Sequence, residues 1–114
     1  MAPKWIVASP YLRAQQTARI AADLLGHSEP ILPSTRLTPE ADPEDVWAEV
    51  RDLAPDSPIL FVAHNPLLNS AASWLTGEKH VIIEFRPGTI ARIDFEQITP
   101  EPRGTVQWIL HASE

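Results

Sequence analysis

Short apolar runs alternate with amphipathic stretches along the chain. Residues 5–8 and 59–63 are continuously apolar and contain β-branched side chains, which predicts two buried strands. Residues 30–37 carry a weaker pattern that predicts a short edge strand and a loop. Strand-like runs then follow one another near the carboxyl end, at residues 81–85, 89–95 and 105–110, with a Pro87-Gly88 turn between the first two.

Three amphipathic stretches predict helices, because apolar residues recur in them at helical spacing. Each begins with a capping residue followed by proline, and these pairs are Ser9-Pro10, Asp42-Pro43 and Asn65-Pro66. Acidic residues after Asp42 favour the first turn of the second helix. We expect the three helices to end at Gly26, before Pro55 and at Gly77.

The order of these elements predicts the fold class. Strands and helices alternate over the first two thirds of the chain, and a run of strands follows. That order is typical of a layered α/β domain with a mixed sheet. A length of 114 residues suits one domain, spanning 1–114.

Composition narrows the possible functions. The chain has no cysteine, which excludes disulfides and thiolate zinc sites, and it has no apolar run long enough to span a membrane. The net charge of −6 disfavours non-specific nucleic-acid binding. Because the sequence begins without a secretory signal, we expect a cytoplasmic protein. No metal or organic cofactor is implied, since His27, His80 and His111 lack metal-like spacing.

The junctions after the two buried strands carry the candidate chemistry. Ligands of open α/β sheets collect where strands lead into helix N-termini, and free N–H groups there favour anions. Arg13 lies in the first turn after one strand, and His64 ends the other. A guanidinium and an imidazolium can both donate hydrogen bonds to phosphate oxygens. The pattern indicates a phosphate site if the two strands are neighbours.

Four motifs, in order, resemble those of the histidine phosphatase superfamily, and are most similar to the SixA-type phosphohistidine phosphatases. The resemblance spans nearly the whole chain. The motifs are Ala8-Ser9-Pro10-Tyr11-Leu12-Arg13-Ala14-Gln15-Gln16-Thr17-Ala18, Leu37-Thr38-Pro39-Glu40-Ala41-Asp42-Pro43, Phe61-Val62-Ala63-His64-Asn65-Pro66 with Trp74-Leu75-Thr76-Gly77, and Phe85-Arg86-Pro87-Gly88-Thr89-Ile90-Ala91-Arg92.

The resemblance implies a three-layer α/β/α sandwich of the phosphoglycerate mutase-like type, with a mixed, mostly parallel sheet. It implies that Arg13 clamps phosphoryl oxygens and that His64 stabilises the charge developing on them during transfer. Glu40 is either a proton donor to the leaving group or a solvated loop acid. The backbone of Asn65 is a weaker candidate ligand, and Ser9 is a helix cap or at most an indirect contact.

One departure from the family matters for activity. Its members begin with a strand ending in Arg-His-Gly, whose histidine is the nucleophile, and no Arg-His-Gly occurs in this sequence. By resemblance, that first strand would lie beside the strand ending at His64. The sequence therefore implies either a domain truncated at its start or one completed by something else. We expect self-association or strand completion at the open position.

Three functions follow from these observations. The first is a phosphohistidine phosphatase-like domain acting on phosphorylated proteins, inactive as this chain alone. The second is a non-catalytic module that binds phosphate or a phosphopeptide. The third is a phosphomonoesterase acting on a small phosphate ester, although the compact chain leaves little room for the insertions that hold sugar phosphates.

Overall fold

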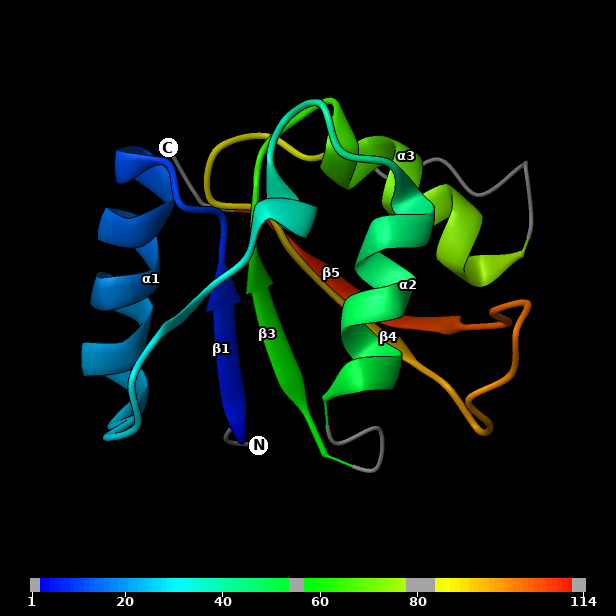
Figure 1. The fold of residues 1–114 in the computed structure, drawn as a ribbon, viewed down its shortest axis with the longest axis horizontal. Helices are drawn as coiled ribbons and strands as arrows, with labels where there is room; N and C mark the ends of the chain where they lie inside the picture. Colours follow the sequence, from blue (N-terminus) through cyan, green and yellow to red (C-terminus); the bar gives the residue numbers. More distant parts are fainter. Residues whose placement is uncertain (1–2, 54–56, 78–83, 112–114) are drawn as a thin grey trace.

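Three parallel strands form the first sheet of the protein. The computed structural model describes residues 3–53, 57–77 and 84–111. Strand β1 (Trp5–Ala8) lies between β2 (Leu32–Pro33) and β3 (Ile59–Val62), as Figure 1 shows. Ala8 pairs with Val62, so β1 and β3 end at the same level. The two predicted buried strands are thus direct neighbours.

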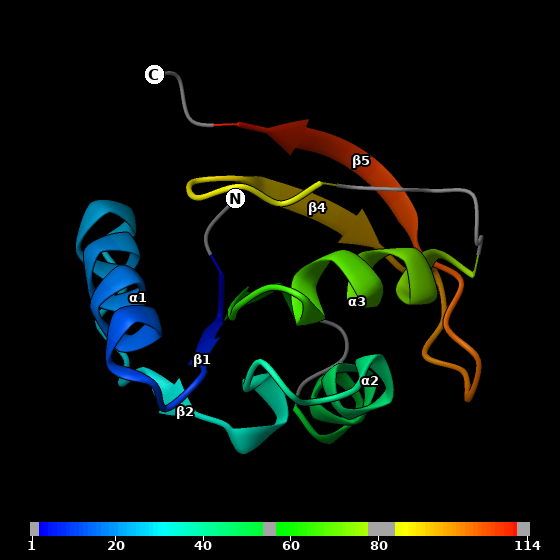
Figure 2. The ribbon, with the colours of Figure 1, turned by 90° about the horizontal axis from the view of Figure 1, so that it is seen from above.

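Helices cover both faces of this sheet. Helix α1 (Leu12–Leu25) lies on one face, and α2 (Pro43–Asp52) and α3 (Leu67–Thr76) lie on the other (Figure 2). Alternate residues of β1 serve the two faces, since Ile6 packs in the α1 core and Val7 in the α2–α3 core. The fold class predicted from the sequence is confirmed.

The second sheet is a two-stranded antiparallel one, made of β4 (Ile90–Asp94) and β5 (Thr105–Leu110). It is anchored near its Asp94–Thr105 end. There the Trp47 Nε1–H donates to the Thr99 carbonyl oxygen at 2.9 Å, and the Gly104 N–H donates to the Leu75 carbonyl oxygen at 2.8 Å. These bonds join the connection between β4 and β5 to α2 and α3.

Among the residues that the structure describes, no hydrogen bond joins a strand of the first sheet to a strand of the second. In the part of the chain that the structure describes, β3 pairs with β1 alone. The Ser9 N–H donates to the Val62 carbonyl oxygen, which puts the main-chain groups of Leu60 and Val62 toward β1. The N–H and C=O groups of Ile59 and Phe61 consequently point to the other side. Within the described ranges, that side of β3 is therefore an unpaired strand edge.

Helix boundaries differ in part from the predictions. Asp42 is the N-cap of α2 as expected, and Asp45 accepts a hydrogen bond from its N–H at 2.9 Å. Ser9 and Asn65 are not N-caps, because α1 begins only after Tyr11 and α3 only after Pro66. The chain continues beyond each strand before it turns into a helix. The glycines expected at the helix ends adopt left-handed conformations, Gly26 at φ 68° and Gly77 at φ 70°.

The predictions for residues 30–37 and 81–89 are met only in part. Residues 35–37, expected as strand or loop, form a short 3₁₀ helix, η1 (Thr35–Leu37), which begins where the Ser34 hydroxyl accepts from the Arg36 N–H. The Pro87-Gly88 turn is confirmed by the Thr89 N–H bond to the Arg86 carbonyl oxygen at 2.9 Å. Of the strand expected at residues 81–85, residues 81–83 lie outside the described residues, and 84–85 are not in a strand.

Candidate functional site

The two predicted junctions meet through a side-chain contact. His64 Nε2 lies 2.8 Å from the hydroxyl oxygen of Ser9, at the ends of the two paired strands. Ser9 is fully buried, and its hydroxyl also accepts from the Tyr11 N–H at 3.3 Å. Ser9 was expected to cap a helix or to contact the phosphate indirectly. It does not cap α1, and its indirect role stays a prediction. It fixes the orientation of the His64 imidazole.

Tyr11 joins three parts of the site, although sequence analysis did not select it. Its ring lies edge-on to the His64 ring, with centroids 5.1 Å apart, and its hydroxyl donates to Glu40 Oε1 at 3.3 Å. The negative charge of Glu40 raises the pKa of Tyr11, with smaller contributions from burial and from the hydrogen bond itself. The sequence feature that could have pointed to Tyr11 is its place two residues before Arg13.

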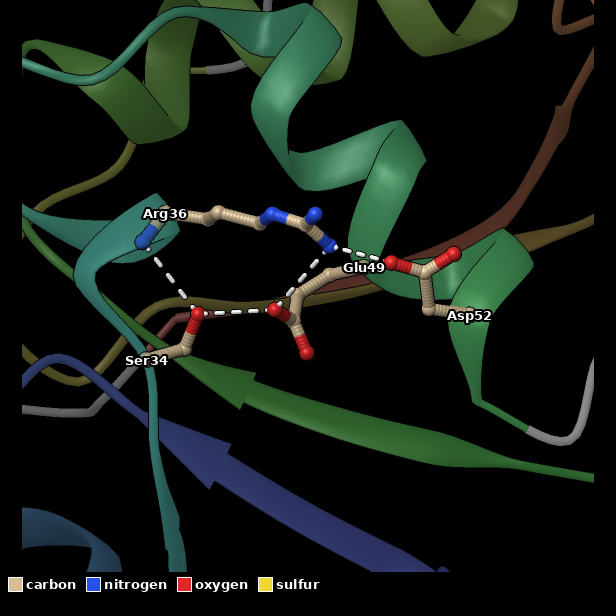
Figure 3. A network of polar contacts seen from close by, with 4 residues as sticks. All are labelled: Ser34, Arg36, Glu49 and Asp52. Atoms are coloured by element: carbon tan, nitrogen blue, oxygen red, sulfur yellow. Dashed lines mark hydrogen bonds and ion pairs between the residues drawn. The ribbon is translucent and has the colours of Figure 1, made fainter.

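Glu40 reaches the site because a polar network holds the segment preceding it. The Ser34 hydroxyl donates to Glu49 Oε1 at 2.9 Å, and Arg36 contacts Glu49 at 3.4 Å and Asp52 at 2.7 Å (Figure 3). These bonds tie η1 to α2, at either end of the loop that contains Glu40. The loop is therefore held at both ends.

Arg13 is exposed in the first turn of α1. In the described ranges it makes no hydrogen bond or ion pair with another residue. Two cavities, one at the carboxyl end of α1 and one beside the middle of that helix, are lined by neither Arg13 nor His64. The structure thus brings the junctions of Arg13 and His64 together without joining the two side chains.

Asn65 uses its side chain to hold the backbone of a distant segment. Its Nδ2 donates to the Phe85 carbonyl oxygen at 2.6 Å, and its Oδ1 accepts from the Asn69 N–H at 3.2 Å. The sequence pointed to the Asn65 backbone as a ligand, and that role stays a prediction. Its side chain instead brings residues 85–89 next to the His64 loop.

The described residues were also examined for a metal site and for a membrane-spanning helix. Over the residues that the structure describes, no group of three or more His, Cys, Asp or Glu side chains is placed to hold a metal ion. Within the same ranges, no helix is both long and apolar enough to cross a lipid bilayer.

A search of solved structures found a close similarity in fold. The structure of the protein histidine phosphatase SixA complexed with tungstate superimposes on this chain with a TM-score of 0.81 and 25% sequence identity. The match covers 97% of this chain and 70% of that one. No family model matches the sequence, and no curated protein sequence does.

The resemblance inferred from the four motifs is confirmed by this similarity. The chain has the fold of the histidine phosphatase superfamily, of the phosphoglycerate mutase-like type. Within that superfamily its fold is similar to that of the protein histidine phosphatase SixA.

Proposed function

We propose that this domain binds a phosphoryl group between Arg13 and His64. The observation that carries the proposal is the 2.8 Å contact between Ser9 and His64, which joins the end of β1 to the end of β3. Helix α1 begins three residues after Ser9, so the first turn of the helix, which carries Arg13, follows directly on that contact. Support also comes from the SixA structure, whose bound tungstate is a tetrahedral oxyanion like phosphate.

The chemistry that we propose is phosphohistidine hydrolysis on proteins. Arg13 would fork onto two phosphoryl oxygens, and His64, held by Ser9, would donate a hydrogen bond to the charge that builds during transfer. Glu40, held by Tyr11, is the candidate proton donor to the leaving group. An imidazole leaving group needs little help from such an acid, so we expect Glu40 to matter least with phosphohistidine.

The nucleophile of this reaction would come from outside the sequence described. We propose that a strand ending in Arg-His-Gly pairs with the free edge of β3, on the side away from β1, and delivers its histidine next to His64. The unpaired main-chain groups of Ile59 and Phe61 support this placement. Without such a strand, we expect the chain to bind phosphate without turnover, or to self-associate through β3.

Turnover is tested by fusing an apolar strand ending in Arg-His-Gly, through a flexible linker, ahead of Met1. We expect this fusion to dephosphorylate a phosphohistidine protein, and the same fusion with alanine in place of its histidine to be inactive. A folded fusion that hydrolyses neither phosphohistidine nor a phosphomonoester would refute the catalytic proposal. Activity on small phosphate esters alone would favour the phosphomonoesterase.

The second candidate is the non-catalytic binding module. It is favoured by the absence of Arg-His-Gly from the sequence together with an intact Arg13–His64 pair of junctions. It predicts that the unmodified chain binds tungstate or a phosphopeptide, and that Arg13→Ala and His64→Ala each weaken binding. Turnover by the unmodified chain would exclude it and would point to another nucleophile, for which His111→Ala is the first variant to examine.

Strand completion has a direct signature in amide hydrogen exchange. The N–H groups of Leu60 and Val62 face β1 and should be protected, whereas those of Ile59 and Phe61 should exchange at least about tenfold faster. The fused strand should remove this alternation. Equal protection of all four amides in a sedimentation-verified monomer would contradict the free edge. Concentration-dependent protection would indicate self-association.

A further inference from the structure

The turn at residues 86–89 is fixed against the loop that carries His64. Both main-chain polar groups of Phe85 are held by side chains at the start of α3. Asn65 Nδ2 donates to the Phe85 carbonyl oxygen at 2.6 Å, and Asn69 Oδ1 accepts from the Phe85 N–H at 2.8 Å. Because Asn65 directly follows His64, residue 86 begins next to the candidate site.

The turn is also closed on itself and tied to β5. The Arg86 N–H donates to the Thr89 hydroxyl at 3.0 Å, and that hydroxyl contacts His111 Nδ1 at 2.9 Å. Figure 1 shows this segment, in yellow, at the end of the first sheet where β1 and β3 lead into their loops. The main chain of Arg86 is therefore held from two sides at the end of the sheet that carries Ser9 and His64.

The Arg86 side chain is exposed, and among the described residues it makes no hydrogen bond or ion pair. Most of the polar side chains around it are already engaged, since Asn65 and Asn69 hold Phe85 and Thr89 closes the turn. The Arg86 side chain is therefore a long, uncommitted guanidinium on a main chain that is held beside the segment carrying His64. Arg13, which is also exposed, lies in the first turn of α1, after the neighbouring strand β1.

We propose that Arg86 is a second phosphate-binding guanidinium, which contacts the same phosphoryl oxygens as Arg13. A tetrahedral dianion has more acceptor positions than one guanidinium can fill. The net charge of −6, with Glu40 close by, also works against anion binding unless local cations offset it. The inference rests on the proposed phosphate site and adds a ligand to it, together with the device that positions that ligand.

Isothermal titration calorimetry with sodium tungstate tests this inference on four proteins, the unmodified chain and its Arg86→Gln, Arg13→Gln and Arg103→Gln variants. Arg103 is the matched control, because it is exposed and lies at the opposite end of the β4–β5 sheet. We expect Arg86→Gln to weaken binding about tenfold or more, as for the loss of one charge-assisted hydrogen bond. Arg103→Gln should change affinity less than about twofold.

A second variant tests how Arg86 is positioned. Asn69→Ala removes the acceptor for the Phe85 N–H without touching either arginine. It should weaken tungstate binding in the unmodified chain and have little further effect in the Arg86→Gln background. The same loss in both backgrounds would contradict positioning through Asn69.

The outcomes separate this inference from the proposed function. Tungstate binding that depends on Arg13, with Arg86→Gln indistinguishable from Arg103→Gln, would overturn the role of Arg86 and leave the proposed phosphate site standing. Failure of the unmodified chain to bind tungstate or inorganic phosphate would overturn both. Thermal unfolding of each variant, expected within a few degrees of the unmodified chain, shows that a loss of affinity is not a loss of fold.

Discussion

Strands β1 and β3 have similar sequences and very different environments. Both are continuous apolar runs, and they pair with each other in register. Yet Ile6, Val7 and Ala8 are 0% exposed, whereas every residue of β3 is only half-buried. The difference is one neighbour, because β1 has a strand on both sides and β3 on one among the described residues. An apolar sequence favours the burial of a strand, and the neighbouring elements decide how much of the strand is covered.

The two ends of the second sheet also differ in how closely they are packed. Near its Asp94–Thr105 end, Trp47 packs against Phe95 with ring centroids 4.7 Å apart. At the opposite end, Ile90, Trp108, Ile109 and Leu110 are all more than a third exposed. The proposed Arg-His-Gly strand beside β3 would give both these exposed apolar side chains and the free edge of β3 a neighbour.

The largest expected effect is on unfolding free energy, and it differs between β1 and β3. Ile6→Ala should cost about 2–5 kcal/mol of unfolding free energy, because the side chain is fully buried in the α1 core. Leu60→Ala, on the same face of β3, should cost about 1–2 kcal/mol. Urea unfolding of both variants measures the difference. Equal costs would contradict the difference in burial between β1 and β3. A larger cost of Leu60→Ala in the strand fusion would show that the added strand buries β3.

The next effect concerns the anchored end of the second sheet. A Cβ on Gly104 would overlap the side chains of Ile93 and Phe95, so we expect Gly104→Ala to cost about 1–3 kcal/mol. Gly26→Ala is the control, because its space is open and only its positive φ opposes the substitution. Thermal unfolding compares the two. A Gly104→Ala protein as stable as the unmodified chain would mean that this end is also loosely packed.

A smaller effect is expected at the network that supports the Glu40 loop. Ser34→Ala removes the hydroxyl that donates to Glu49 and accepts from the Arg36 N–H, which should cost about 1 kcal/mol. Thr35→Ala is the matched control, since its hydroxyl is exposed beside the same turn. Urea unfolding monitors both variants, and equal stabilities would show that the network adds nothing.

The smallest effect is a titration of Tyr11, the only tyrosine in the chain. Glu40 raises the pKa of Tyr11, so Glu40→Gln should lower it, and bound tungstate should raise it further. Tyrosinate absorbance at alkaline pH measures all three values, with Glu44→Gln as the control. The pKa of Tyr11 is higher in the folded protein than its unfolded value of about 10. The neutral tyrosine therefore stabilises the fold fully below that pH, and this stabilisation is lost as the pH rises through the folded pKa.

Local signals predicted the elements well and their first turns less well. Asp42 was identified as a cap because the residues that satisfy it are its immediate neighbours in sequence. Ser9 and Asn65 gave the same signal and do different work, since their side chains have partners far along the chain, at His64 and Phe85. A capping pattern cannot reveal a competing tertiary partner, and here the competing partners belong to the candidate site.

The sequence by itself determined the strand–helix order, the helix ends at glycine and the SixA-like motifs, and it singled out the Arg13 and His64 junctions as candidates. These features depend on residues close together in the chain or on a recognisable pattern. Only the tertiary structure decided that β1 and β3 are neighbours, that Tyr11 bridges Glu40 and His64, and that Asn65 holds the main chain of Phe85. Such contacts join residues up to 55 positions apart, and local spacing carries no record of which distant groups will meet.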